Sequence, residues 1–155
     1  MNAQTQAELD HFVTRLDAFL VRCSEFEKSG KWNTNRLGFM SAYFETDLFA
    51  VALQIMSADG RFERAEAEVF NAMFQTSYTP KQLWETYHSV DSVVDGYIDT
   101  NVSSALTRLK RVDRDLAEEY RQLILGVCQV VSLADGVAEG EEVKIIDSLR
   151  AALEA

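Results

Sequence analysis

The stretch SADGRFERAEAEVFNAMF, residues 57–74, returns 76 residues later as LADGVAEGEEVKIIDSL, residues 133–149. Each copy joins two apolar helical segments through an Ala-Asp-Gly turn. The acidic positions of the two copies coincide at this offset: Asp59 with Asp135, Glu63 with Glu139 and Glu66 with Glu142. Two copies of a helix–turn–helix, at a spacing too long for a solenoid, predict a pseudo-symmetric domain. Repeat one spans about residues 35–75 and repeat two about 115–153.

The composition predicts one globular domain over residues 1–155. With 47% hydrophobic and 26% charged residues, the chain is long enough to bury a core of its own. The net charge of −10 argues against nucleic acid and against anionic membranes as direct partners, because both require a basic surface. The charge is compatible with cations or basic partners, and equally with an ordinary solvated acidic surface.

The cysteines and the N-terminus indicate a cytoplasmic protein. Cys23 and Cys128 occupy apolar positions of helical patterns, which is typical of buried free thiols in a reducing compartment. The first residues, MNAQTQAELD, have neither the basic nor the apolar region of a signal peptide. No apolar run reaches the roughly 18 residues of a membrane span.

Apolar residues recur at helical spacing along nearly the whole chain. Leu9, Phe12, Leu16, Phe19 and Cys23, for example, follow one another at intervals of three and four. Helices are predicted over 4–27, 34–57, 63–75, a short segment starting at Thr79-Pro80, 102–112, 115–133 and 139–153, with 89–101 a loop or short helix. No useful stretch alternates at period two, so the expected fold is all-α with six or seven helices. The helices that lead into the two turns are the most apolar, so we expect them to be central and to pack against each other.

Each turn reads Asp-Gly-x-apolar-Glu-x-x-Glu, or nearly so, and its glutamates have a structural explanation. Glycine allows the positive φ that a sharp reversal needs. The pairs Glu63/Glu66 and Glu139/Glu142 resemble a capping box, in which the acid at the third helical position reaches back to a free backbone N–H. Acidic side chains in a first turn are also favoured by the helix dipole.

The same acids are candidate metal ligands. Asp59-Gly60 followed by Glu66 matches the second half of an EF-hand calcium loop. The earlier ligand positions fall on Ile55, Ser57, Val131 and Leu133, which excludes an EF-hand. Half a loop has too few oxygens for a hard cation, but two halves together would offer four carboxylates: Asp59, Glu66, Asp135 and Glu142, with Glu63 and Glu139 at the rim. An all-carboxylate set predicts calcium first, then magnesium or manganese, and disfavours zinc.

The paired helix–ADGxxxxxE–helix pattern resembles the tellurite-resistance TerB-like family. The resemblance covers residues 34–155, and the first helix is an addition to it. It implies an all-helical, stress-linked domain that chelates metal or acts as a membrane-associated scaffold and has no settled reaction. The matching acids are Asp59, Glu63, Glu66, Asp135, Glu139 and Glu142. Arg61 and Arg64 depart from the acidic character of the first turn and would weaken its cation affinity.

We therefore predict a non-enzymatic, stress-associated domain that binds a divalent cation and acts as a scaffold. Its partners would be proteins rather than nucleic acid, and any membrane association would be indirect. The alternative is a metal-independent interaction module whose acids only cap helices. A metal-dependent hydrolase is a third possibility, but His11 and His88 lie far from both turns in the sequence, and no nucleophile motif is present.

The sequence has one basic cluster, Arg108-Leu-Lys-Arg111 with Arg114. It is either a site for phosphate or an acidic partner, or a solvated helix end where cations are favoured by the helix dipole.

Overall fold

The computed structural model describes residues 3–59, 62–94, 101–134 and 141–154. The fold is an all-α single domain, and no strand occurs within those ranges. Its elements are α1 (Ala3–Lys28), α2 (Thr34–Leu37), α3 (Met40–Met56), the 3₁₀ turn η1 (Ser57–Asp59), α4 (Arg64–Phe74), α5 (Pro80–Val94), α6 (Ser103–Val112), α7 (Arg114–Ala134) and α8 (Glu141–Glu154). Apart from the single turn α2, these are the helices that the hydrophobic periodicity predicts, with ends that differ by a few residues.

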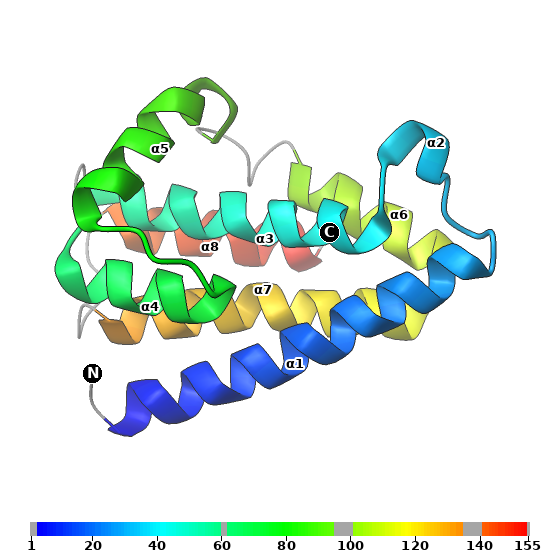
Figure 1. Ribbon diagram of the computed structural model, residues 1–155, viewed down its shortest axis with the longest axis horizontal. Coiled ribbons are helices and arrows are strands. Elements are labelled where there is room, and N and C mark those ends of the chain that lie inside the picture. Colours follow the sequence, from blue (N-terminus) through cyan, green and yellow to red (C-terminus); the bar gives the residue numbers. More distant parts are fainter. Residues whose placement is uncertain (1–2, 60–61, 95–100, 135–140, 155) are drawn as a thin grey trace.

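The helices of the two predicted repeats pack around the pair α3 and α7. These helices contact each other, as predicted, and run in the same direction to the same end of the molecule (Figure 1). The helices that follow the turns, α4 and α8, start from that end and run back. Each packs against the incoming helix of the other repeat, so that α4 contacts α7 and α8 contacts α3. An approximate twofold relation between the two predicted repeats would produce the same pair of contacts, and this relation stays a prediction.

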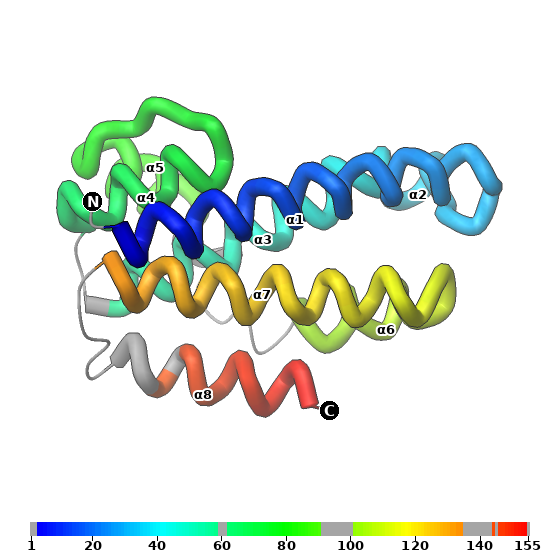
Figure 2. Tube along the Cα trace, turned by 90° about the horizontal axis from the view of Figure 1, so that it is seen from below, coloured from blue at the N-terminus to red at the C-terminus, as the bar shows by residue number. Residues whose placement is uncertain are grey.

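The first helix is an integral part of the core rather than an addition to it. α1 packs against α7, α3 and α4, and Figure 2 shows α7 between α1 and α8. Three aromatic rings meet where α1, α3 and α7 come together: Phe19, Phe44 and Tyr120 lie edge to face, with centroids 5.0–6.0 Å apart. All three are buried. The apolar face of α1 therefore covers apolar side chains of α3 and α7 that would otherwise be exposed.

The prediction of one continuous helix over 34–57 is wrong, because the chain breaks at Gly38. Gly38 has φ 76°, a left-handed value that glycine adopts at little cost. Its carbonyl oxygen accepts a hydrogen bond from the indole Nε1 of Trp32 at 3.0 Å instead of continuing a helix. The helix restarts at Met40, whose backbone N–H donates to the carboxylate of Glu27 at the end of α1. Phe39 lies between the two helices with an extended backbone, and its side chain is 67% exposed.

The start of α5 follows its sequence signal. Thr79 Oγ1 accepts a hydrogen bond from the backbone N–H of Gln82 at 3.1 Å, and the Thr79 N–H donates to Gln82 Oε1 at 2.9 Å. Pro80 occupies the first helical position, where its missing N–H costs nothing. The helix continues to Val94, so residues 89–94 of the segment predicted as a loop or short helix belong to α5. Residues 95–100 lie outside the described ranges.

The C-terminal cap of α4 offers a stability prediction. Gln75 has φ 55° and ψ 48°, the left-handed conformation that costs a residue with a side chain about 1–2 kcal/mol. We expect Gln75→Gly to raise the free energy of unfolding in urea by about 0.5–1 kcal/mol, the remainder being lost to the flexibility of glycine in the unfolded chain. Gln75→Ala, which keeps the strain, should change stability by less than about 0.5 kcal/mol. Equal effects of the two substitutions would contradict the prediction.

Candidate functional site

The first acidic turn connects α3 to α4 through η1. Glu63 is the residue before α4 and is extended, with φ −88° and ψ 163°. Its backbone N–H donates to Glu66 Oε1 at 3.1 Å, and the two glutamates form the predicted capping box. Glu63 is exposed, whereas the side chain of Glu66 is fully buried. The structural role predicted for this glutamate pair is therefore confirmed.

Phe62 fixes the path of the chain into α4. Its side chain is only 8% exposed and packs edge to face against Trp84 and Tyr87 of α5, with ring centroids 6.0 and 6.1 Å away. Burying this ring draws residue 62 into the core immediately before the helix begins. The apolar residue of the turn thus orients the acids that follow it.

The second turn lies between the end of α7 at Ala134 and the start of α8 at Glu141. Asp135 and Glu139 lie outside the described residues, as do the side chains of Asp59 and Glu142. Among the described residues, η1, which ends at Asp59, contacts α8, which carries Glu142. The beginning of the first turn therefore lies against the helix that follows the second.

No metal centre is formed by the described side chains alone. Among them, no three His, Cys, Asp or Glu residues come together as potential ligands. Of the six predicted acids, Glu63 and Glu66 are those whose side chains are described, so the shared site of Asp59, Glu66, Asp135 and Glu142 stays a prediction.

The two cysteines are buried thiols that stay protonated at neutral pH. Both are buried and free, as predicted. Burial raises the pKa of the Cys23 thiol and of the Cys128 thiol to about 12 in each case. A thiol with such a pKa remains protonated at neutral pH, so neither residue supplies a thiolate nucleophile in this conformation.

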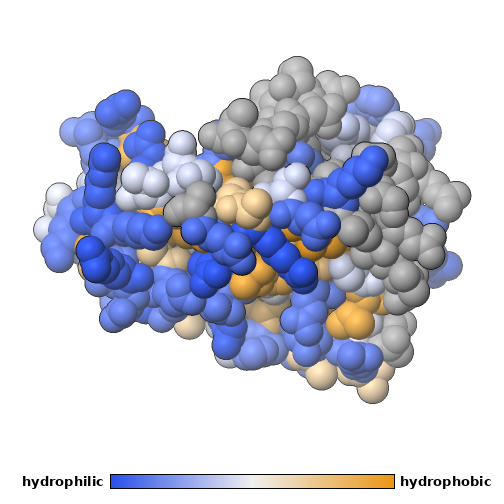
Figure 3. All heavy atoms as spheres, turned by 180° about the vertical axis from the view of Figure 1, so that it is seen from behind, coloured by the Kyte–Doolittle hydropathy of each residue, from blue (hydrophilic) through white to orange (hydrophobic). Residues whose placement is uncertain are grey.

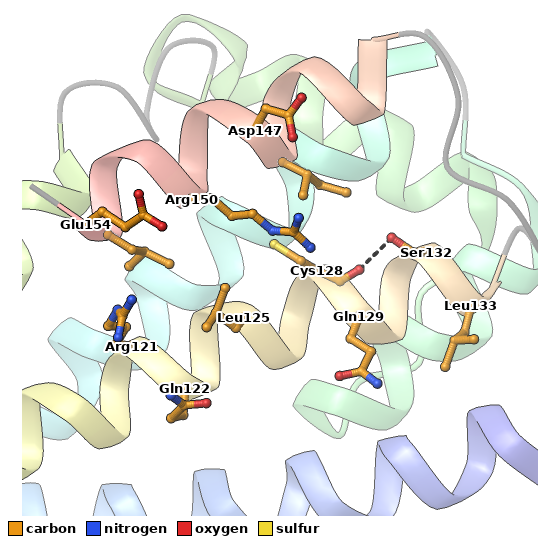
Figure 4. A pocket seen from close by; sticks show the side chains of 12 residues that line it. Arg121, Gln122, Leu125, Cys128, Gln129, Ser132, Leu133, Asp147, Arg150 and Glu154 are labelled. Atoms are coloured by element: carbon orange, nitrogen blue, oxygen red, sulfur yellow. Dashed lines mark hydrogen bonds between the residues drawn. The ribbon is translucent and has the colours of Figure 1, made fainter.

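Sequence reasoning missed two hollows beside α8. The first, which we call the α7–α8 groove, has a volume of about 770 Å³ and is lined by residues that include Leu125, Cys128 and Gln129 of α7 and Ile146, Arg150 and Leu153 of α8 (Figure 4). The second, the basic pocket, has a volume of about 720 Å³ and is lined by residues that include Lys110, Arg111, Arg114, Glu118, Arg121 and Leu153. The basic cluster of the sequence was the one signal that pointed to either.

The α7–α8 groove combines an apolar floor with polar walls. Cys128, Ile146 and Leu153 are each less than 10% exposed and form the floor. Figure 4 shows Arg150 reaching from α8 towards α7 and Gln129 standing on the α7 wall. On the face opposite to the view of Figure 1, apolar surface is exposed near the centre between hydrophilic side chains (Figure 3). Such a surface suits an amphipathic ligand better than a purely polar one.

Within the described residues, no helix is both long and apolar enough to cross a bilayer.

Comparison with known proteins identifies a family. The family model described as "Tellurite resistance protein TerB" matches residues 45–155, which include both acidic turns. No significant match was found among curated proteins or among solved structures. The TerB domain is not a known enzyme family. The family match and the all-helical fold agree, and the chain belongs to the tellurite-resistance TerB family.

Proposed function

We propose that this TerB domain is a non-enzymatic, stress-associated scaffold that binds a divalent cation through its two acidic turns and holds partner proteins. The contact between η1 and α8 is the observation that carries the cation part, because it joins the beginning of the first turn to the helix after the second. The tellurite-resistance description of the family supports the association with stress.

The chemistry of the acids fits a hard cation. The ligands would be Asp59, Glu66, Asp135 and Glu142, with Glu63 and Glu139 at the rim. Carboxylate oxygens favour calcium first, then magnesium or manganese. Glu66 is fully buried beside the first turn, and a bound cation would offset the cost of keeping several carboxylates close together. The proposed ion therefore has a structural task, which is to hold the two turns against each other.

A metal-independent interaction module is the second candidate. The Glu63–Glu66 capping box favours it, since this pair already satisfies backbone groups at the start of α4. In that case the acids would stabilise helix ends, and the scaffold would work without an ion.

Thermal unfolding with calcium distinguishes the two functions. At a calcium concentration ten times its Kd, mass action adds about 1.4 kcal/mol, which corresponds to a rise in Tm of roughly 3–6 °C for a chain of this size. The double variant Asp59→Asn with Asp135→Asn should lose this rise. The matched control, Asp10→Asn with Asp17→Asn on the exposed side of α1, removes the same charge and should keep it.

Two results would count against the cation site. A calcium effect that survives the Asp59/Asp135 double change would place the ion elsewhere on the acidic surface. The absence of any calcium effect, with the wild-type protein folded, would leave the capping-only module as the function.

A further inference from the structure

The α7–α8 groove and the basic pocket form one continuous surface. Both hollows are lined by Arg121, Leu153 and Glu154, so they meet at the C-terminal end of α8. Along α7 their linings extend from Arg114 to Leu133, which is about 30 Å at the helical rise of 1.5 Å per residue. A surface of this length is suited to a peptide segment rather than to a compact ligand.

This surface is basic on a protein whose net charge is −10. Five cations line it, Lys110, Arg111, Arg114, Arg121 and Arg150, against three acids, Glu118, Asp147 and Glu154. Of these five cations, Arg121 is the one that forms an ion pair with another described residue. The Nη1 atom of Arg121 lies 3.6 Å from Oε1 of Glu118. An ion pair at the protein surface contributes little to stability.

Helix-end electrostatics explain only part of the cluster. Lys110 and Arg111 occupy the last turn of α6, where the helix dipole favours cations. Arg114 is the first residue of α7, where the dipole disfavours a cation, and it lines the same pocket as the other two. A solvated helix end therefore accounts for Lys110 and Arg111 but not for Arg114.

We propose that this surface binds an acidic amphipathic helix of a partner protein. The apolar side of such a helix would lie on Leu125, Ile146 and Leu153, and its carboxylates would face the arginines and Lys110. Helix-in-groove recognition uses apolar anchors at helical spacing, and complementary charge fixes orientation and speeds association. This inference rests on the proposed scaffold role and names the chemistry of its partner.

The test uses an 18-residue fluorescein-labelled peptide of glutamate, alanine and leucine, with the leucines on one helical face. Fluorescence anisotropy should show saturable binding by the wild-type protein that weakens as salt rises, because the charges are exposed and screened. A scrambled peptide of the same composition should bind at least tenfold more weakly. A peptide with lysine in place of glutamate should not bind.

The variant Lys110→Glu with Arg114→Glu should lower the affinity at least tenfold. Both residues are exposed, so circular dichroism and Tm should report a folded protein. Arg150→Gln tests the other half of the surface and should lower the affinity as well. The control Arg36→Glu with Lys81→Glu makes the same charge change on α2 and α5 and should bind as the wild type does.

Several outcomes would overturn the proposal. Absence of peptide binding, or binding that the Lys110/Arg114 variant retains, removes the surface as the site. Displacement of the peptide by inorganic phosphate or by a single-stranded oligonucleotide at equal charge would identify a phosphate site instead. Self-association by sedimentation that the same variant abolishes would make a second copy of the chain the occupant.

The cation site and this surface can fail separately. Peptide binding is measured for the Asp59→Asn with Asp135→Asn variant, and calcium stabilisation for the Lys110→Glu with Arg114→Glu variant. We expect each property to survive the change at the other site. If calcium does not stabilise the wild-type protein, the peptide result still stands. If the peptide does not bind, the calcium result still stands.

Discussion

Replacing Phe44 by alanine should lower the free energy of unfolding by about 3–5 kcal/mol, since it removes a fully buried aromatic ring and leaves a cavity. Phe44 packs against four other aromatic rings in this part of the core. Its centroid lies 5.0 Å from that of Tyr120, 6.0 Å from Phe19, 5.4 Å from Trp32 and 4.9 Å from Tyr43. The cavity would open where α1, α3 and α7 meet, so the loss would be felt by all three helices.

Urea unfolding followed by circular dichroism measures this loss. Phe39→Ala is a matched control, because it removes the same ring five residues earlier from a position that is 67% exposed, and it should cost less than about 0.5 kcal/mol. Phe44→Leu, which keeps most of the volume, should cost less than the alanine variant and remain measurable if that variant does not fold. A loss below about 1.5 kcal/mol for Phe44→Ala would show that the three helices do not depend on this contact.

The helices were predictable wherever one face is apolar and nothing interrupts it. The pattern over 115–133 gives α7 (Arg114–Ala134) within one residue at each end. Thr79-Pro80 marks the start of α5 because capping and the fixed φ of proline act between close neighbours. Signals of this kind are local, so the sequence contains them without knowledge of the tertiary fold.

The break at Gly38 was not predictable from the same pattern. Leu37 and Phe39 are apolar and fit a helix that runs from 34 to 57. What ends α2 is a left-handed glycine held by the indole of Trp32, and what starts α3 is the carboxylate of Glu27 from another helix. These contacts exist only once α1, α2 and α3 are packed, and periodicity does not record them.

Among the candidate sites, too, the ones formed by close neighbours in the sequence were predictable and the ones formed by packing were not. The Glu63–Glu66 capping box joins residues three apart and was readable from the sequence. The α7–α8 groove depends on how α8 docks beside α7, and its lining residues are scattered between residues 121 and 154. The basic cluster around Arg114 is visible in the sequence. Only the packing of the helices shows that it lines a pocket together with Leu153 of α8.

A buried polar pair between α3 and α7 was also invisible in the hydrophobic pattern. Asp47 is 2% exposed and Tyr120 is fully buried, and the Tyr120 hydroxyl donates a hydrogen bond to the Asp47 carboxylate. Asp47 occurs in a mostly apolar helix, where an acid looks like a solvent-facing position, as the exposed Glu45 two residues earlier is. Because the bond joins the two central helices, it fixes their relative position more specifically than apolar contact does.

Tyr120→Phe should therefore cost about 1–3 kcal/mol, the range for removing one partner of a buried hydrogen bond. The substitution removes one oxygen and leaves the ring packing against Phe19 and Phe44 in place. Tyr43→Phe is the matched control. Tyr43 is half-buried and packs on Phe44, and among the described residues its hydroxyl makes no hydrogen bond, so we expect a change below about 0.5 kcal/mol.

A double-mutant cycle isolates the pair from the rest of the core. Tyr120→Phe, Asp47→Ala and the combined variant are compared in urea with the wild type. If the hydroxyl and carboxylate stabilise each other, the double variant should lose less than the sum of the single losses, by about 1–3 kcal/mol, because the second change removes an interaction already lost. Losses that add within about 0.5 kcal/mol would mean that the two groups contribute independently. The bond between Asp47 and Tyr120 would then not hold the two central helices together.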